Sequence, residues 1–243
     1  PGAGELCVAG APFSLLDYAN AHAHAEEIAA ATRTRAMPPW LPEPAHSRFV
    51  NERRLTDDQI GLIDRWVAQG APEGDPAARR APPAFAKGVQ LGTPDRVVTA
   101  TDAFTIGPAD RETFRHLVIP VPAAETRYVR AVEFRAGNPR VVHHANVALD
   151  RTRASRTLDR ADPGPGFAAM PEDLVQNVFG WSPGKVPVFE PPETAWTLEP
   201  GSDLVVQMHM VPGRTPETVQ PSIGLFFAST PPTRVPIVVK LES

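Results

Sequence analysis

The chain contains the stretch Val141-Val142-His143-His144-Ala145-Asn146-Val147-Ala148-Leu149-Asp150, which follows the turn-forming residues Gly137-Asn138-Pro139. Its valine and leucine content after such a turn predicts a β-strand. Two adjacent histidines are unusual in an apolar strand, because successive side chains point to opposite faces of a sheet. Both imidazoles can therefore reach one metal ion only if the strand is bulged or the two rings bind through different nitrogens. The alternative is one buried, hydrogen-bonded histidine and one surface histidine.

A second predicted strand supplies a third histidine. It reads Leu204-Val205-Val206-Gln207-Met208-His209-Met210-Val211, and strand alternation places His209 on the same face as Gln207. The two methionines of this run point to the other face, where we expect them to lie in the core or against a partner. Imidazole suits both copper and zinc, so three rings on two strands form a candidate metal site. The predicted ligands are His143, His144 and His209.

The sequence says less about the residues that surround these ligands. A carbonyl or carboxylate oxygen is expected to accept a hydrogen bond from the outer nitrogen of each ring and to fix its tautomer, but the sequence does not identify these partners. His46 and His116 lack a comparable pattern, and we predict that both are structural or exposed.

Short β-branched runs alternate with proline and glycine turns from Leu91 onward. This spacing predicts an antiparallel, jelly-roll-like β-sandwich, so the chain is predicted to be mainly β. The segment Arg151–Pro200 is rich in proline, glycine and aspartate, and we expect it to cross the surface as loops. The predicted strands are Arg96–Ala100, Arg115–Val121, Arg127–Arg135, Val141–Asp150, Asp203–Val211, Ser222–Ala228 and Val235–Leu241.

The N-terminal part has a helical pattern instead. Residues 1–75 are predicted to form a small helical domain, residues 76–90 a proline- and alanine-rich linker, and residues 91–243 the sandwich domain. The alanine-rich segment Asp17–Arg35 predicts one helix.

A second helix is predicted from its end signals. Thr56 and Gln59 form a capping box at its start, and Gly70 suits the position just after its end. We expect its apolar face to consist of Ile60, Ile63, Trp66 and Val67.

Composition narrows the function classes. The net charge is −4 without a basic stripe, which argues against nucleic acid and anionic membranes as partners. No apolar run is long enough to span a bilayer. Proline accounts for 29 of the 243 residues, more than twice its usual share of about 5%, and favours a loop-rich β protein over a helical bundle. Cys7 is the only cysteine, so the chain can form neither an internal disulfide nor a cysteine-rich zinc site.

The two histidine strands resemble those of the copper type II, ascorbate-dependent monooxygenases, the family of peptidylglycine α-hydroxylating monooxygenase and dopamine β-monooxygenase. The resemblance rests on Val142–Val147 and Val205–His209, and it implies that the three histidines bind the electron-transfer copper. It extends in order over further short segments, which are Leu91–Asp95, Arg127–Asn138, Gly180–Lys185 and Gly224–Phe227.

The N-terminal part resembles the cytochrome c-like domain that a bacterial branch fuses to the monooxygenase. The resembling segments are Ala11–Leu16, Met37–Trp40 and the stretch from Leu55–Asp58 through Gly70–Asp75. This resemblance offers Met37 as the axial ligand of haem c in the full-length parent. The attachment motif Cys-x-x-Cys-His is absent, so we expect no covalent haem in this chain and favour a Met37 that packs under Trp40.

The resemblance also implies that a part is missing. In the family, the oxygen-activating copper binds a His-x-His pair and a methionine of a second domain, and nothing after Ser229 could supply them. We interpret the chain as the electron-transfer half of a periplasmic or secreted monooxygenase that lacks its C-terminal domain, with an unknown small-molecule or peptide substrate. The alternatives are a non-catalytic copper-binding sandwich, an electron carrier built on the cytochrome c-like module, and a sandwich whose histidines merely pack.

Overall fold

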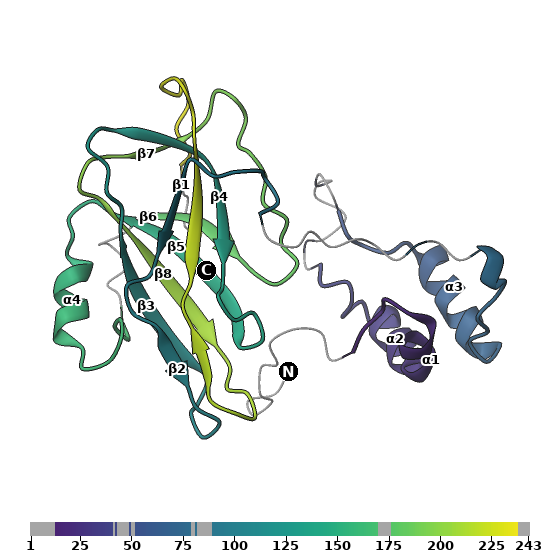
Figure 1. Cartoon of the computed structure of the whole chain (residues 1–243). Helices are drawn as coiled ribbons and strands as arrows, with labels where there is room; N and C mark the ends of the chain where they lie inside the picture. Colours follow the sequence, from purple (N-terminus) through teal and green to yellow (C-terminus); the bar gives the residue numbers. More distant parts are fainter. Residues whose placement is uncertain are drawn as a thin grey trace. The chain divides into compact units, whose positions relative to one another are not determined.

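The computed structural model describes residues 13–40, 42, 49, 52–78, 81, 89–169 and 176–237, with only the backbone of Pro76. These residues fall into two compact units, one before and one after the segment 82–88, as the ribbon in Figure 1 shows. The division lies inside the predicted linker 76–90.

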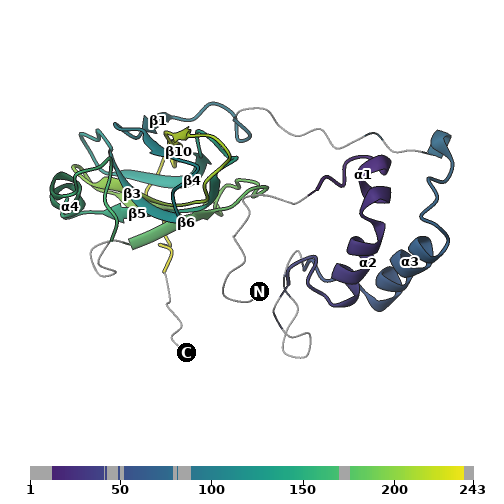
Figure 2. The ribbon, with the colours of Figure 1, turned by 90° about the horizontal axis from the view of Figure 1, so that it is seen from below.

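The larger unit is an antiparallel β-sandwich, which confirms the predicted fold class. One sheet has the strand order β1-β10-β4-β7, with the bounds Arg96–Thr99, Ser222–Phe227, Arg127–Arg135 and Trp196–Leu198. The other has the order β3-β8-β5-β6, with the bounds Thr113–Pro120, Asp203–Met210, Val142–Asp150 and Gln176–Trp181. Strands β2 (Phe104–Ile106) and β9 (Glu217–Val219) form a separate two-stranded sheet. Figure 2 shows the two larger sheets as stacked layers.

The core lies between the two layers and consists of the inward-facing side chains of both. In β8 these include Met208 and Met210, whose exposed fractions are zero. In β5 they include Ala145, Val147 and Leu149. Burying a valine, leucine or methionine contributes about 1.5–3 kcal/mol, so this face stabilises the sandwich. The histidines lie on the opposite face of both strands. The expected core position of the methionines is confirmed.

The prediction of loops for Arg151–Pro200 was wrong in part. The segment contains helix α4 (Ser155–Ala161) and the strands β6 and β7. Both strands lie at sheet edges, where pairing with β5 and β4 decides the conformation more than residue preference does. Helix α4 begins where the buried Asp150 carboxylate accepts hydrogen bonds from the backbone N–H groups of Thr152, Arg153 and Ser155.

The predicted last strand, Val235–Leu241, was also wrong where it can be compared. Residues 235–237 are irregular, with Val235 and Ile237 exposed, and residues 238–241 lie outside the described part of the chain. A run of β-branched residues forms a strand only where a sheet edge is available for pairing.

The smaller unit contains α1 (Tyr18–Ala23), α2 (Ala25–Arg33), α3 (Asp57–Ala68) and the 3-10 turn η1 (Pro76–Ala78). The predicted Asp17–Arg35 helix is interrupted at His24, which ends α1 and precedes α2. The capping box of Thr56 and Gln59 is present, and Gly70 follows α3 with a φ of 81°. On the predicted apolar face of α3, Ile60 is buried and Ile63, Trp66 and Val67 are half-buried. No helix among the described residues is both long and apolar enough to cross a membrane.

Candidate metal centre

A β-bulge brings the adjacent histidines to one face of β5. Strand β5 pairs with β8 so that Val142 lies opposite Met210 and His144 opposite His209, with a register shift between Val142 and His144. The extra residue on β5 is His143. A bulge adds a residue to one strand and re-aims its side chain, which cancels the alternation that would separate the two rings. Of the two geometries that the sequence allowed, the bulged strand is the one observed.

The three predicted ligands converge through the same ring atom. Nδ1 of His143 lies 3.2 Å from Nδ1 of His144 and 3.2 Å from Nδ1 of His209, and the last two Nδ1 atoms are also 3.2 Å apart. The ring planes cross at 65°, 79° and 70°, so the rings surround a common point instead of stacking. Ligand bonds of about 2.0–2.1 Å at near-tetrahedral angles require nitrogen separations of roughly 3.3 Å.

Burial favours a neutral His144 ring at this point. His209 is buried, and His143 and His144 are half-buried. Burial lowers the pKa of His144, and the neighbouring His209 and His143 rings lower it further. Imidazoles that aim unprotonated ring nitrogens at one point bring lone pairs together, which a bound cation relieves. The group therefore fits a metal ion that accepts nitrogen ligands.

Two residues on or beside β3 hold His209 in place. Nε2 of His209 contacts a carboxylate oxygen of Glu112, away from the line of a straight hydrogen bond, and it has no hydrogen-bond partner among the described residues. The ring of Phe114 stacks on the His209 ring with a centroid distance of 4.3 Å and an interplanar angle of 5°. The negative charge of a carboxylate beside Nε2 favours the proton on that nitrogen, which leaves Nδ1 free for a metal.

Sequence reasoning missed Glu112 and Phe114. The spacing Glu112-x-Phe114-x-His116 indicates that these three side chains share one face of a strand. It does not predict their contact with His209, because the sequence does not specify the β3–β8 register. That register places Phe114 opposite His209 and His116 opposite Gln207.

A row of polar side chains lies beside the three ligands. Asn146 donates to Oε1 of Gln207 over 3.2 Å, and Nε2 of Gln207 lies 2.9 Å from Nε2 of His116. Nδ1 of His116 lies 3.3 Å from the carbonyl oxygen of Phe167. The amide must donate to His116, so the proton of that ring is on Nδ1. Burial lowers the pKa of His116, which keeps it neutral. His116 is thus a buried structural histidine, one of the two roles predicted for it; His46 lies outside the described residues.

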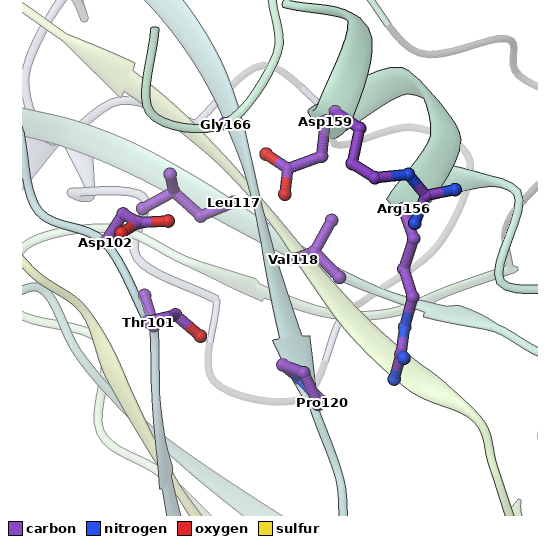
Figure 3. A pocket seen from close by; sticks show the side chains of 10 residues that line it. Thr101, Asp102, Leu117, Val118, Pro120, Arg156, Asp159 and Gly166 are labelled. Carbon is purple, nitrogen blue, oxygen red and sulfur yellow. The ribbon is translucent and has the colours of Figure 1, made fainter.

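A cavity of about 200 Å³ lies apart from the histidines, between β3 and α4. Figure 3 shows Asp102 and Asp159 directed toward it from opposite sides, with Leu117 and Val118 between them. Burial raises the pKa of Asp159, and the charge of Asp102 raises it further. Among the described residues, only His143, His144 and His209 form a group of three or more side chains able to hold a metal.

Met37 does not lie in a site of haem size. Its side chain is 53% exposed, and it lines a cavity of about 20 Å³ together with Trp40. Such a volume holds about one water molecule and is far smaller than haem. Cys7 lies outside the described residues.

No protein-family model matches the chain, and no curated protein is significantly similar to it. The three imidazoles and their surroundings are the features of the chain that bear on its function.

Proposed function

We propose that the chain binds one copper ion through Nδ1 of His143, His144 and His209, and that this copper transfers electrons. The observation that carries the proposal is the mutual 3.2 Å separation of the three Nδ1 atoms. Imidazole nitrogens bind copper in proteins, and a given nitrogen site generally binds Cu²⁺ more tightly than Zn²⁺. The resemblance of the two histidine strands to the ascorbate-dependent monooxygenases supports copper over zinc.

The protein residues give this site a fixed geometry. His144 and His209 lie opposite each other on paired strands, and His143 is the extra residue of the bulge on β5. Glu112 orients His209, and Phe114 covers one face of that ring. Copper bound there would accept an electron from a reductant such as ascorbate and pass it on. A rigid set of three nitrogens moves little between the two oxidation states, which favours electron transfer.

We further propose that the chain is the electron-transfer half of a monooxygenase that hydroxylates carbon–hydrogen bonds. The support is the order of the resembling segments along the chain. In this reading, oxygen is activated on a second domain with a His-x-His pair and a methionine. The gene beyond Ser243 should encode these residues, and reading it tests the proposal. A downstream sequence without them would favour the alternative, a non-catalytic copper-binding or electron-transfer protein.

The copper proposal is tested with the purified chain. Metal-free protein is loaded with equal amounts of Cu²⁺ and Zn²⁺, passed through a desalting column, and analysed for both metals. We expect copper to be retained over zinc, and we expect its paramagnetic resonance signal to disappear on addition of ascorbate. Retention of zinc over copper, or bound Cu²⁺ that ascorbate does not reduce, would contradict the proposed function.

A further inference from the structure

A second cavity of about 200 Å³ lies at the edge of the sandwich, away from the three histidines. It is lined by β4, β6, β7 and the loop of residues 182–190. Its walls are largely apolar and include an aromatic ring from each of two strands. The apolar lining residues are Ala131, Val132, Val178, Phe179, Val186, Val188 and Trp196. Sites for drug-sized ligands measure roughly 300–1,000 Å³, so this cavity suits a smaller molecule.

The guanidinium group of Arg130 lines this cavity without an acidic partner. Its Nε is buried and has no hydrogen-bond partner among the described residues, where Arg130 also forms no ion pair. The Cζ atom lies 4.5 Å from the centre of the Phe189 ring, which holds the group in place by a cation–π contact. Buried donors are almost always paired, and a guanidinium pairs best with a carboxylate. A guanidinium group that lines a cavity without an acidic partner therefore points to an anionic ligand.

A second cation is held at the cavity in the same way. Nζ of Lys185 lies 4.5 Å from the centre of the Phe179 ring and contacts the carbonyl oxygen of Gly180. Glu190 is the carboxylate among the lining residues, and the ion pairs of the described chain include neither Glu190 nor Lys185. Two cations and one anion leave the lining with one excess positive charge. That balance matches a ligand with a single negative charge.

We propose that this cavity binds a small organic monocarboxylate with an apolar body. The carboxylate lies against Arg130, where a guanidinium can bind both of its oxygens. The apolar body lies against Phe179 and Trp196. Glu190 disfavours ligands that carry a second negative charge. The site shares no residue with the metal centre, so it does not depend on the proposed copper function.

Benzoate is a suitable probe, because it combines one carboxylate with a flat apolar ring. The metal-free full chain is titrated with benzoate, and binding is followed by NMR through the indole N–H resonance of Trp196. We expect a saturable shift. Uncharged benzamide and dianionic terephthalate should each bind at least about tenfold more weakly, because the first lacks the charge and the second meets Glu190.

Variants locate the binding. Arg130→Met should weaken benzoate binding at least about tenfold, since it removes the paired cation. Arg127→Met is the matched control: Arg127 is on the same strand, lies 5.8 Å from the Phe227 ring and pairs with Glu125, but does not line the cavity. It should leave benzoate affinity unchanged. If Arg130→Met unfolds, Lys185→Gln at the exposed side of the cavity should still weaken binding severalfold. Absence of a saturable shift, or equal affinity in wild type and a folded variant at either position, overturns the proposal.

Discussion

Nδ1 of His143 lies 3.2 Å from Nδ1 of His209, although the two residues are 66 positions apart in the chain. The β5–β8 pairing brings the strands together, and the bulge at His143 turns its ring toward the outer face. The metal ligands are therefore set by sheet pairing, while Met208 and Met210 on the opposite face belong to the core. Removing a histidine should alter metal binding without altering the fold.

Removal of the Glu112 carboxylate should weaken copper binding about 10–100-fold, the usual effect of losing a carboxylate that orients a metal-bound histidine. Glu112→Ala deletes the group that contacts Nε2 of His209, and Glu112→Asp should give an intermediate loss. The measurement is copper affinity by competition with a chelator. Glu125→Ala is the control, because Glu125 forms an exposed pair with Arg127. Equal affinities of Glu112→Ala and wild type would exclude this role.

The Asp150–Ser155 hydrogen bonds should contribute to stability above acidic pH. Burial by itself would raise the pKa of Asp150, but hydrogen bonds from Ser155 and Thr152 outweigh it and lower that pKa. Ser155→Ala removes one bond to a buried carboxylate and should cost about 1.5–3 kcal/mol in the free energy of unfolding at pH 7. A depressed carboxyl pKa stabilises the fold above the unfolded value of about 3.9 and loses this effect as pH falls through the folded pKa. The gap between wild type and variant in urea unfolding should therefore narrow at low pH.

Thr157→Ala is the matched control for this helix. Thr157 is exposed on α4 and accepts a hydrogen bond from Arg160. Its removal should change the free energy of unfolding by less than about 0.5 kcal/mol. A Ser155→Ala variant as stable as Thr157→Ala would show that the buried carboxylate does not depend on the Ser155 hydroxyl.

Two aspartates near the C-terminal end of α4 should respond oppositely to removal of their charge. Burial, followed by the charge of Asp102, raises the pKa of Asp159, whereas the hydrogen bond from Arg115 lowers the pKa of Asp162. A raised carboxyl pKa means that the folded state binds protons more readily, so ionisation destabilises the fold as pH rises above about 3.9. We expect Asp159→Asn to raise the melting temperature at pH 7 and Asp162→Asn to lower it. The Asp159→Asn difference should vanish below about pH 3, where that carboxyl group is protonated in wild type as well, and the Asp162→Asn difference should be lost as pH falls through the lowered pKa of Asp162. Shifts of the same sign at pH 7 would refute this assignment.

Most of the sandwich strands could be predicted because their residues have a high intrinsic preference for the β conformation. β4, β5, β8 and β10 are β-branched or aromatic runs between turns, and each was predicted within two residues of its observed ends. β6 and β7 were missed, since edge pairing determines them. Asp150 was included in a strand, but its role at the start of α4 depends on a tertiary arrangement that the sequence pattern does not contain.

The sequence predicted the metal ligands of the candidate site, but not the residues that contact and orient them. Histidine in apolar strands is a rare pattern with a chemical reason, and it identified His143, His144 and His209. Two adjacent strand histidines can bind one metal ion through the same ring nitrogen only if the strand is bulged, but residue preferences alone do not predict a bulge at His143. Glu112 and Phe114 reach His209 only through the β3–β8 register, which no local pattern specifies.

Copper stoichiometry of His209→Ala tests the central claim most directly. Wild type, His209→Ala and the exposed-histidine control His22→Ala are loaded with Cu²⁺, desalted and analysed for copper per chain, and their thermal unfolding is recorded without metal. We predict one copper per chain for wild type and for His22→Ala, little retained copper for His209→Ala, and cooperative unfolding of all three. Undiminished copper in His209→Ala would contradict the metal-site assignment, and loss of its fold would show that the histidines serve packing instead.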